Sequence, residues 1–217
     1  MTVTIAEELL LLAYSEEEGK QLISAAQLDP ALAGAILAEL AVAERVELSD
    51  KKVTLKDPAP LGDDELDTTL ARIAAEAKGR KPVWWIQRLQ SGKLRRRLLT
   101  RLAESGVLAE ERGKILGIFP TTRWPEADPG VEADVRERVS SVLGGADPDA
   151  RTAVLIAIMH AAKLDRKAFP GASRARQGDR RGAWAADAVA KTIAAINAAM
   201  VVAVTSAAVA GAGAASG

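Results

Sequence analysis

The sequence predicts a mainly α-helical single domain: a helical bundle with a central apolar helix ringed by amphipathic helices, plus two short β-hairpins. Apolar residues recur at the three- and four-residue spacing of a helix face along most of the chain. Residues 31–43 hold one charge, Glu39, so this helix is apolar on every side and belongs at the centre of a core. Glu39 should have a partner there, because an unpaired buried carboxylate is costly. Two alternating runs, each around a polar turn, predict the hairpins.

Composition supports one domain over residues 1–210, followed by a disordered tail at 211–217. Of the 217 residues, 48% are hydrophobic, which is enough for a core, and the formal net charge is zero. The absence of cysteine excludes disulfides and thiolate chemistry and suits a reducing cytosol. The N-terminus lacks the basic region of a signal peptide, so we expect a cytoplasmic protein. Asn197 is the only asparagine while alanine and arginine abound, which is typical of GC-rich bacterial genomes.

The first elements are expected to be three helices. Thr4 and Glu7 form a capping box that opens the first helix. A short helix is expected at residues 17–26. Asp29 as N-cap and Pro30 in the first turn then predict the start of the central apolar helix.

The middle of the chain shows a helix followed by a hairpin twice. The first hairpin is expected at 45–48 and 53–56, and Asp63 and Asp64 then mark the start of an amphipathic helix. The second hairpin is expected to pair 107–108 with 115–119 around a turn at 110–114. The remaining helices are expected at 82–89, 93–105, 131–142, 149–164 and from about 183 onward.

Positive charge is concentrated in two stretches. Residues 77–103 contain nine basic side chains and no acidic one, and residues 163–181 contain seven basic and two acidic side chains. Such segregation indicates one surface aimed at an anion-rich partner, although charge runs are also common on solvated helix faces.

Catalytic signals are absent from the sequence. His160 is the only histidine and lies on an apolar run, which favours a satisfied core or edge histidine. A zinc site would need more histidine or cysteine ligands, and there is no phosphate-binding loop, nucleophile elbow or dinucleotide fingerprint. The carboxylates of Asp63, Asp64, Glu65 and Asp67 are compatible with an acid–base pair, but a helix start explains them more simply. We therefore expect no enzymatic activity, no cofactor and no metal.

Two readings of the remaining features stay open. Two helix–hairpin units are compatible with winged helices, which predicts a nucleic-acid-binding protein, but the arginine helix at 93–105 contains no Asn or Gln to read bases. Trp84 and Trp85 suit base stacking, a membrane interface or core packing. Residues 192–217 carry no charge and are long enough to span a membrane, yet their small side chains favour a buried core helix.

Several segments together resemble the Golgi phosphoprotein 3 family. The matching pieces, in order, are AEELLLLA (6–13), ALAGAILAELAVAERVEL (31–48), LGDDELDTTL (61–70), WIQRL (85–89), RRRLLTRLAESGVL (95–108), ILGIFPTTRWP (115–125) and DARTAVLIAIMHA (149–161). The resemblance implies a helical domain with a projecting hairpin that aids self-association. It also implies a peripheral membrane protein that binds phosphatidylinositol 4-phosphate.

The resemblance carries over only part of the lipid pocket. Eukaryotic members use a tryptophan and three arginines, whose positions fall near Ser24, on Ala33, near Gly92 and on Arg95. Only Arg95 keeps the family's residue. Because the basic run is retained, the resemblance still implies affinity for anionic phospholipids in general.

These observations lead to one functional prediction. We expect a cytoplasmic, non-enzymatic protein that associates reversibly with the inner face of a membrane. Headgroup phosphates are expected to meet Arg88, Lys93, Arg95 and Arg96. Trp84 or Trp85 is expected at the membrane interface, and the hairpin at 107–119, with Leu108, Ile115 and Phe119, is expected to mediate homo-oligomers.

Overall fold

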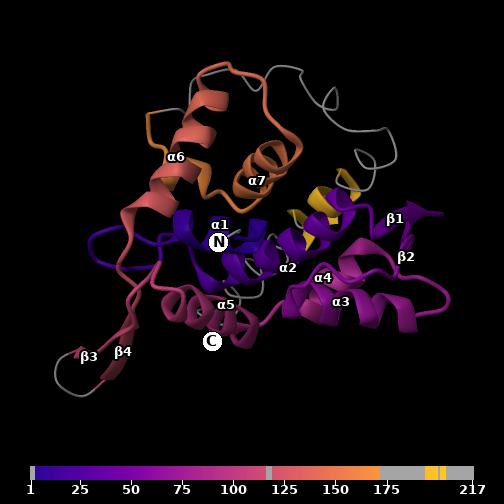
Figure 1. The fold of residues 1–217 in the computed structure, drawn as a ribbon, viewed down its shortest axis with the longest axis horizontal. Helices are drawn as coiled ribbons and strands as arrows, with labels where there is room; N and C mark the ends of the chain where they lie inside the picture. The colour runs from indigo at the N-terminus through magenta and orange to yellow at the C-terminus, as the bar shows by residue number, and fades with distance from the viewer. Residues whose placement is uncertain (1–2, 116–118, 172–193, 200, 204–217) are drawn as a thin grey trace, which may run out of the picture.

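The computed structural model describes residues 3–115, 119–171, 194–199 and 201–203 (Figure 1). Its helices are α1 (Ile5–Ala13), α2 (Ala25–Val42), α3 (Asp64–Ala75), α4 (Pro82–Leu89), α5 (Gly92–Glu104), α6 (Pro129–Leu143), α7 (Ala150–Ala161) and α8 (Asp165–Ala168). Its strands are β1 (Val46–Ser49), β2 (Lys52–Leu55), β3 (Glu111–Ile115) and β4 (Phe119–Arg123). The predicted mainly α-helical class with two short hairpins is confirmed.

Helix α2 is the centre of the bundle, as its composition predicts. Every residue from 30 to 41 is buried. Helices α1 and α7 pack on one side of α2, and α3, α4 and α5 pack on the other, so α6 and α7 lie across the bundle from α5 (Figure 1). By length and composition α2 would suffice to cross a membrane, but 72% of that stretch is buried inside the fold. It is the core helix of this bundle.

The start of α2 differs from the prediction. Ser24 is the N-cap, and its N–H and hydroxyl both donate to Gln27 Oε1, at 3.2 and 2.9 Å. This cap starts the helix five residues before Pro30, which therefore lies inside α2. Residues 16–18 form a turn, and the helix expected to start at residue 17 is absent there. The prediction was wrong because the capping box supplies a start signal that outweighs the loss of one N–H at a proline.

The first hairpin is confirmed and the second is shifted. Strands β1 and β2 are antiparallel, as expected. Strand β3 occupies the stretch predicted to be a turn, and Ile115 pairs with Phe119 across the ladder. Leu108 lies outside the hairpin: it bridges to Glu126 and is buried in the core. The predicted pairing of 107–108 with 115–119 was wrong because the apolar side chain of Leu108 packs in the core and not in the hairpin. The hairpin projects from the bundle (Figure 1).

The C-terminal part of the chain is described only in pieces. Residues 194–199 and 201–203 are helical, and Ile196, Ala199 and Ala203 are buried in the core. This agrees with a core helix. The start of that helix near 183 and the tail at 211–217 lie outside the described residues.

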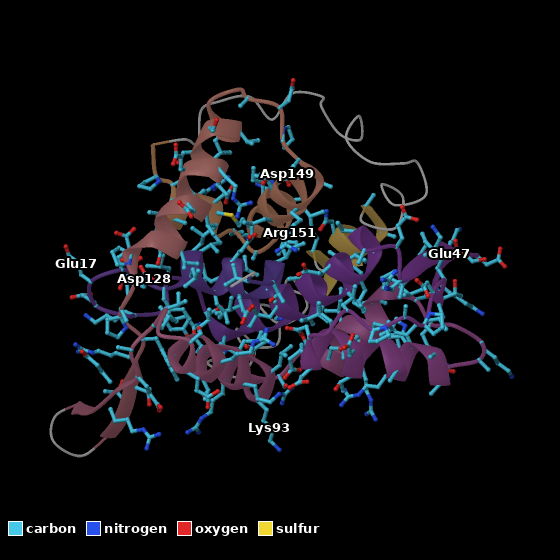
Figure 2. The ribbon with its side chains drawn as sticks, viewed as in Figure 1. Glu17, Glu47, Lys93, Asp128, Asp149 and Arg151 are labelled. Carbon is cyan, nitrogen blue, oxygen red and sulfur yellow. The ribbon has the colours of Figure 1, made fainter. Side chains whose placement is uncertain are left out.

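Buried ion pairs connect α1 and α2 to the surrounding helices. Glu39, on α2, accepts from the Ile5 N–H at 2.6 Å and pairs with Arg151 of α7, which confirms that it needs a partner. Burial raises the pKa of Glu39, and the Arg151 charge and the Ile5 hydrogen bond oppose that rise. Two further pairs, Arg101 with Glu7 at 2.7 Å and Arg138 with Glu8 at 2.8 Å, join α5 and α6 to α1. Figure 2 shows Arg151 between α7 and α2.

Candidate anion-binding surface

Helix α5 divides its side chains between the core and solvent. Ser91 caps its N-terminus by accepting from the Leu94 N–H at 3.1 Å, and Gly106 follows its C-terminus with a φ of 79°. The leucines at 94, 98, 99 and 102 are buried. With the leucines facing the bundle, the helical period leaves Lys93, Arg96, Arg97, Thr100 and Glu104 on the outer face.

The outer face of α5 forms a shallow hollow of about 520 Å³, lined by the five residues just named. Lys93 points away from the bundle (Figure 2), and both Lys93 and Arg96 are exposed. Neither forms an ion pair within the described part of the chain, so both cations are available to an external anion. The charge of Arg96 also acts on Glu110, whose pKa is lowered chiefly by a hydrogen bond from Arg112.

The three consecutive arginines have three different environments. Arg96 is exposed, whereas Arg95 forms an ion pair with Asp29 of α2 and its side chain is only 20% exposed. Arg97 pairs with Glu65 of α3 through two hydrogen bonds, one of them Nη2 to Oε2 at 2.9 Å. The prediction of a shared phosphate cluster therefore needs correction at Arg95, whose charge is matched inside the protein.

Helix α4 contributes one exposed aromatic residue. Trp84 is 36% exposed and carries the Arg80 guanidinium over its ring, 5.2 Å from the centroid. Trp85 is 2% exposed and packs edge-to-face with Trp84, so the prediction of an interfacial role is wrong for Trp85: it is a core residue. Arg88 is exposed one turn beyond Trp84 and forms no ion pair among the described residues. The exposed side of α4 thus carries cations and an indole ring.

The residues at the positions of the family's lipid pocket have structural roles in this protein. Ser24 caps α2, and Ala33 is fully buried. Gly92 begins α5, where an added Cβ would lie 3.6 Å from Nη2 of Arg95. Arg95 therefore has no second arginine beside it from these positions, and its partner is Asp29.

The acidic residues near α3 have structural roles, as the sequence predicts. Asp63 accepts from the N–H groups of Glu65 and Leu66, both at 3.0 Å, and pairs with Arg101 at 2.6 Å. Asp67 accepts from the backbone N–H groups of residues 61 and 62. These bonds explain the acidic cluster by helix capping and ion pairing.

The remaining predicted residues fall into two cases. His160 is an edge histidine, with Nδ1 2.9 Å from Asp165, and no group of three or more potential metal ligands occurs among the described residues. Leu108, which lies outside the hairpin, is buried and so is not part of an exposed oligomerisation surface. Ile115 and Phe119 are backbone register partners in the β3–β4 ladder, and their role in oligomers stays a prediction.

Comparison with known proteins gives the same family as the sequence segments. The family model for Golgi phosphoprotein 3 (GPP34) matches residues 5–196. Vacuolar protein sorting-associated protein 74 of Eremothecium gossypii is 28% identical over 168 residues, which cover 65% of this chain and 49% of the relative. The chain thus spans about half the length of this curated relative. Because the family model covers most of the chain, the protein belongs to the Golgi phosphoprotein 3 family.

Proposed function

We propose that this protein binds anionic phospholipid headgroups at a membrane surface through the outer face of α5. The observation that supports this most directly is the pair Lys93 and Arg96, two exposed cations on one helix face with no internal counter-ion among the described residues. Arg88 and Trp84 on α4 extend the contact, the first to a phosphate and the second to the interface.

The expected affinity is moderate and sensitive to salt. Each Lys or Arg near an anionic surface contributes about 1 kcal/mol. Three such side chains would therefore hold the protein reversibly, without covalent anchoring. Because these cations are exposed, added salt should screen them over roughly 8 Å at physiological ionic strength.

We propose that selectivity follows charge and not the stereochemistry of an inositol ring. Family membership favours phosphatidylinositol 4-phosphate as one ligand, but Asp29 neutralises Arg95, and Ser24, Ala33 and Gly92 supply no further cation or indole. The proposed role is non-enzymatic and cytoplasmic, with reversible attachment to the inner face of the membrane. Self-association through the β3–β4 hairpin, with Ile115 and Phe119, belongs to the same proposal.

Co-sedimentation with vesicles tests this function. Vesicles of phosphatidylcholine alone are compared with vesicles that also contain phosphatidylglycerol, over a series of salt concentrations. We expect the protein to pellet only with the anionic vesicles at low salt. The double variant Lys93→Ala/Arg96→Ala should lose most of this binding.

The matched control removes the same two residue types from another part of the surface. Arg166→Ala/Lys167→Ala takes one exposed arginine and one exposed lysine from α8, which follows α7 on the side of the bundle away from α5. It should bind anionic vesicles like the unaltered protein. A gel shift with duplex DNA covers the nucleic-acid alternative. DNA binding without vesicle binding, or equal losses in the two double variants, would overturn the proposal.

A further inference from the structure

The loop between α1 and α2, residues 15–20, lies on the base of the β3–β4 hairpin. The Gly19 carbonyl accepts from the Trp124 N–H at 3.1 Å, and the Glu16 carbonyl accepts from the Glu126 N–H at 3.2 Å. Both donors lie just after β4, where the hairpin joins the bundle (Figure 1). Gly19 has a φ of 57°, and a Cβ added there would collide with the Trp124 backbone, so the loop and the hairpin base are in close contact.

One arginine connects this loop to α6. The Arg136 guanidinium pairs with Glu16 of the loop through Nε at 2.7 Å and with Glu132 of α6 through Nη2 at 2.7 Å. Its Nη1 donates to the Ala168 carbonyl at 3.2 Å, and the guanidinium lies 5.6 Å from the centroid of the Phe169 ring. These contacts fix the guanidinium in place. A single positive charge therefore serves two carboxylates from two parts of the chain.

The two carboxylates that share Arg136 differ in exposure. The Glu132 side chain is 3% exposed, whereas that of Glu16 is 51% exposed. Burial raises the pKa of Glu132 to about 7, Arg136 opposes the rise, and the charges of Glu126 and Glu16 add to it. Burial also raises the pKa of Glu126, with further contributions from Glu16 and Asp128. Negative charge therefore exceeds positive charge around Arg136 once Glu132 is ionised.

The difference in exposure decides which carboxylate keeps the arginine. At about pH 6 most Glu132 side chains are protonated, so the charge of Arg136 attracts Glu16. At about pH 8 Glu132 is ionised, and a buried carboxylate cannot lose its cation without a large cost. An exposed carboxylate such as Glu16 exchanges its ion pair for water at little cost. Glu16 is therefore the group that leaves when the pH rises.

We propose that residues 15–20 form a pH-sensitive latch on the base of the β3–β4 hairpin, closed by the Arg136–Glu16 ion pair and opened when ionised Glu132 competes for Arg136. In the open state the N–H groups of Trp124 and Glu126 lose their acceptors in the latch. The hairpin base then has fewer contacts with the bundle, so the hairpin is free to change its angle. This inference goes beyond the proposed membrane function and does not depend on it.

Amide hydrogen exchange of the full chain, followed by NMR at pH 6 and pH 8, tests the latch. Each rate is divided by the intrinsic exchange rate at the same pH, which gives a protection factor. We expect the protection factors of the Trp124 and Glu126 amides to fall several-fold between pH 6 and pH 8. The Val53 amide, which donates to the Arg80 carbonyl at 2.8 Å beside the other hairpin, should keep its protection.

Three substitutions separate the roles of the carboxylates. Glu132→Gln cannot ionise, so the Trp124 and Glu126 amides should be equally protected at both pH values. Glu16→Gln removes the charge that Arg136 attracts, so their protection at pH 6 should fall several-fold. Glu18→Gln is the matched control: it removes a charge from the same loop, but Glu18 pairs with Lys20. This variant should behave like the unaltered protein.

Amides at the centre of α2 show whether an effect is local, because they exchange through global unfolding. They should keep their protection in Glu16→Gln, and an equal decrease there and at Trp124 would contradict a local latch. Constant protection of the Trp124 and Glu126 amides between pH 6 and pH 8 in the unaltered protein would overturn the inference. So would a pH dependence that persists in Glu132→Gln, or losses in Glu18→Gln as large as those in Glu16→Gln.

Discussion

Two groups of basic residues in this bundle look alike in sequence but differ in their ion pairing and in the direction of their side chains. Arg101, Arg138 and Arg151 reach inward to carboxylates of α1 and α2 that are almost fully buried. Lys93 and Arg96 point outward from α5 and have no ion-pair partner within the described ranges. The inner group holds helices together, and the outer group is available to a ligand.

The difference shows that counting positive charges does not locate a binding surface. A guanidinium paired with a buried carboxylate is not available to a ligand, because breaking the ion pair would leave an uncompensated charge in the protein interior. An exposed cation keeps its water and exchanges it for an anion at little cost. Arg95 and Arg96 are adjacent in the chain, yet Asp29 places Arg95 with the inner group.

The largest expected effect comes from removing an inner arginine. Arg151→Ala leaves Glu39 without its cation and also removes a 2.8 Å hydrogen bond to the Val3 carbonyl. We expect the free energy of unfolding to fall by about 3 kcal/mol. Urea denaturation measures this change. The double variant Glu39→Gln/Arg151→Met should recover part of the loss, and equal stability of Arg151→Ala and the unaltered protein would contradict the inner role.

A smaller effect should appear as a pH dependence at Glu132. Arg136 is shared by Glu132 and Glu16, both at 2.7 Å, so the buried Glu132 carboxylate is only partly compensated. Burial is the main cause that raises the pKa of Glu132 to about 7, and Arg136 opposes it. The folded state therefore holds a proton that the unfolded state releases near pH 4.5. Stability should fall as the pH rises from about 4.5 to 7, by about 2–3 kcal/mol from this group.

Glu132→Gln isolates that contribution. The amide has the same shape and does not ionise in this range. The difference in unfolding free energy between the variant and the unaltered protein should grow in favour of the variant between pH 5 and pH 8. A difference that stays constant over this interval would show that Glu132 does not titrate there.

The smallest expected effect on stability belongs to the outer cations. Lys93→Ala/Arg96→Ala should change the free energy of unfolding by less than about 0.5 kcal/mol, because both side chains are exposed and unpaired among the described residues. Thermal or urea unfolding measures this. A decrease in the free energy of unfolding as large as that of Arg151→Ala would show that Lys93 and Arg96 have structural partners. It would then contradict the proposal that they are available to a ligand.

Patterns within single elements were enough to predict most of the fold. The apolar run at residues 31–43 identified the central helix, of which residues 30–41 are buried. Two local predictions failed, the start of α2 and the strands of the second hairpin. The Ser24 cap outweighed Asp29 and Pro30, and Leu108 had an apolar side chain for a reason other than strand pairing.

The sequence by itself determined the fold class, the family and the region in which the cations are concentrated. The fold class and the cation-rich region depend on periodicity and composition, whereas the family was indicated by the order of the matching segments. Only the tertiary structure decided which cations are free. The partners of Arg95 and Arg97 lie 66 and 32 residues away along the chain, so their ion pairs exist only after α2 and α3 have packed beside α5. Burial likewise separated Trp84 from Trp85, because which of two adjacent side chains faces the core depends on what packs against the helix.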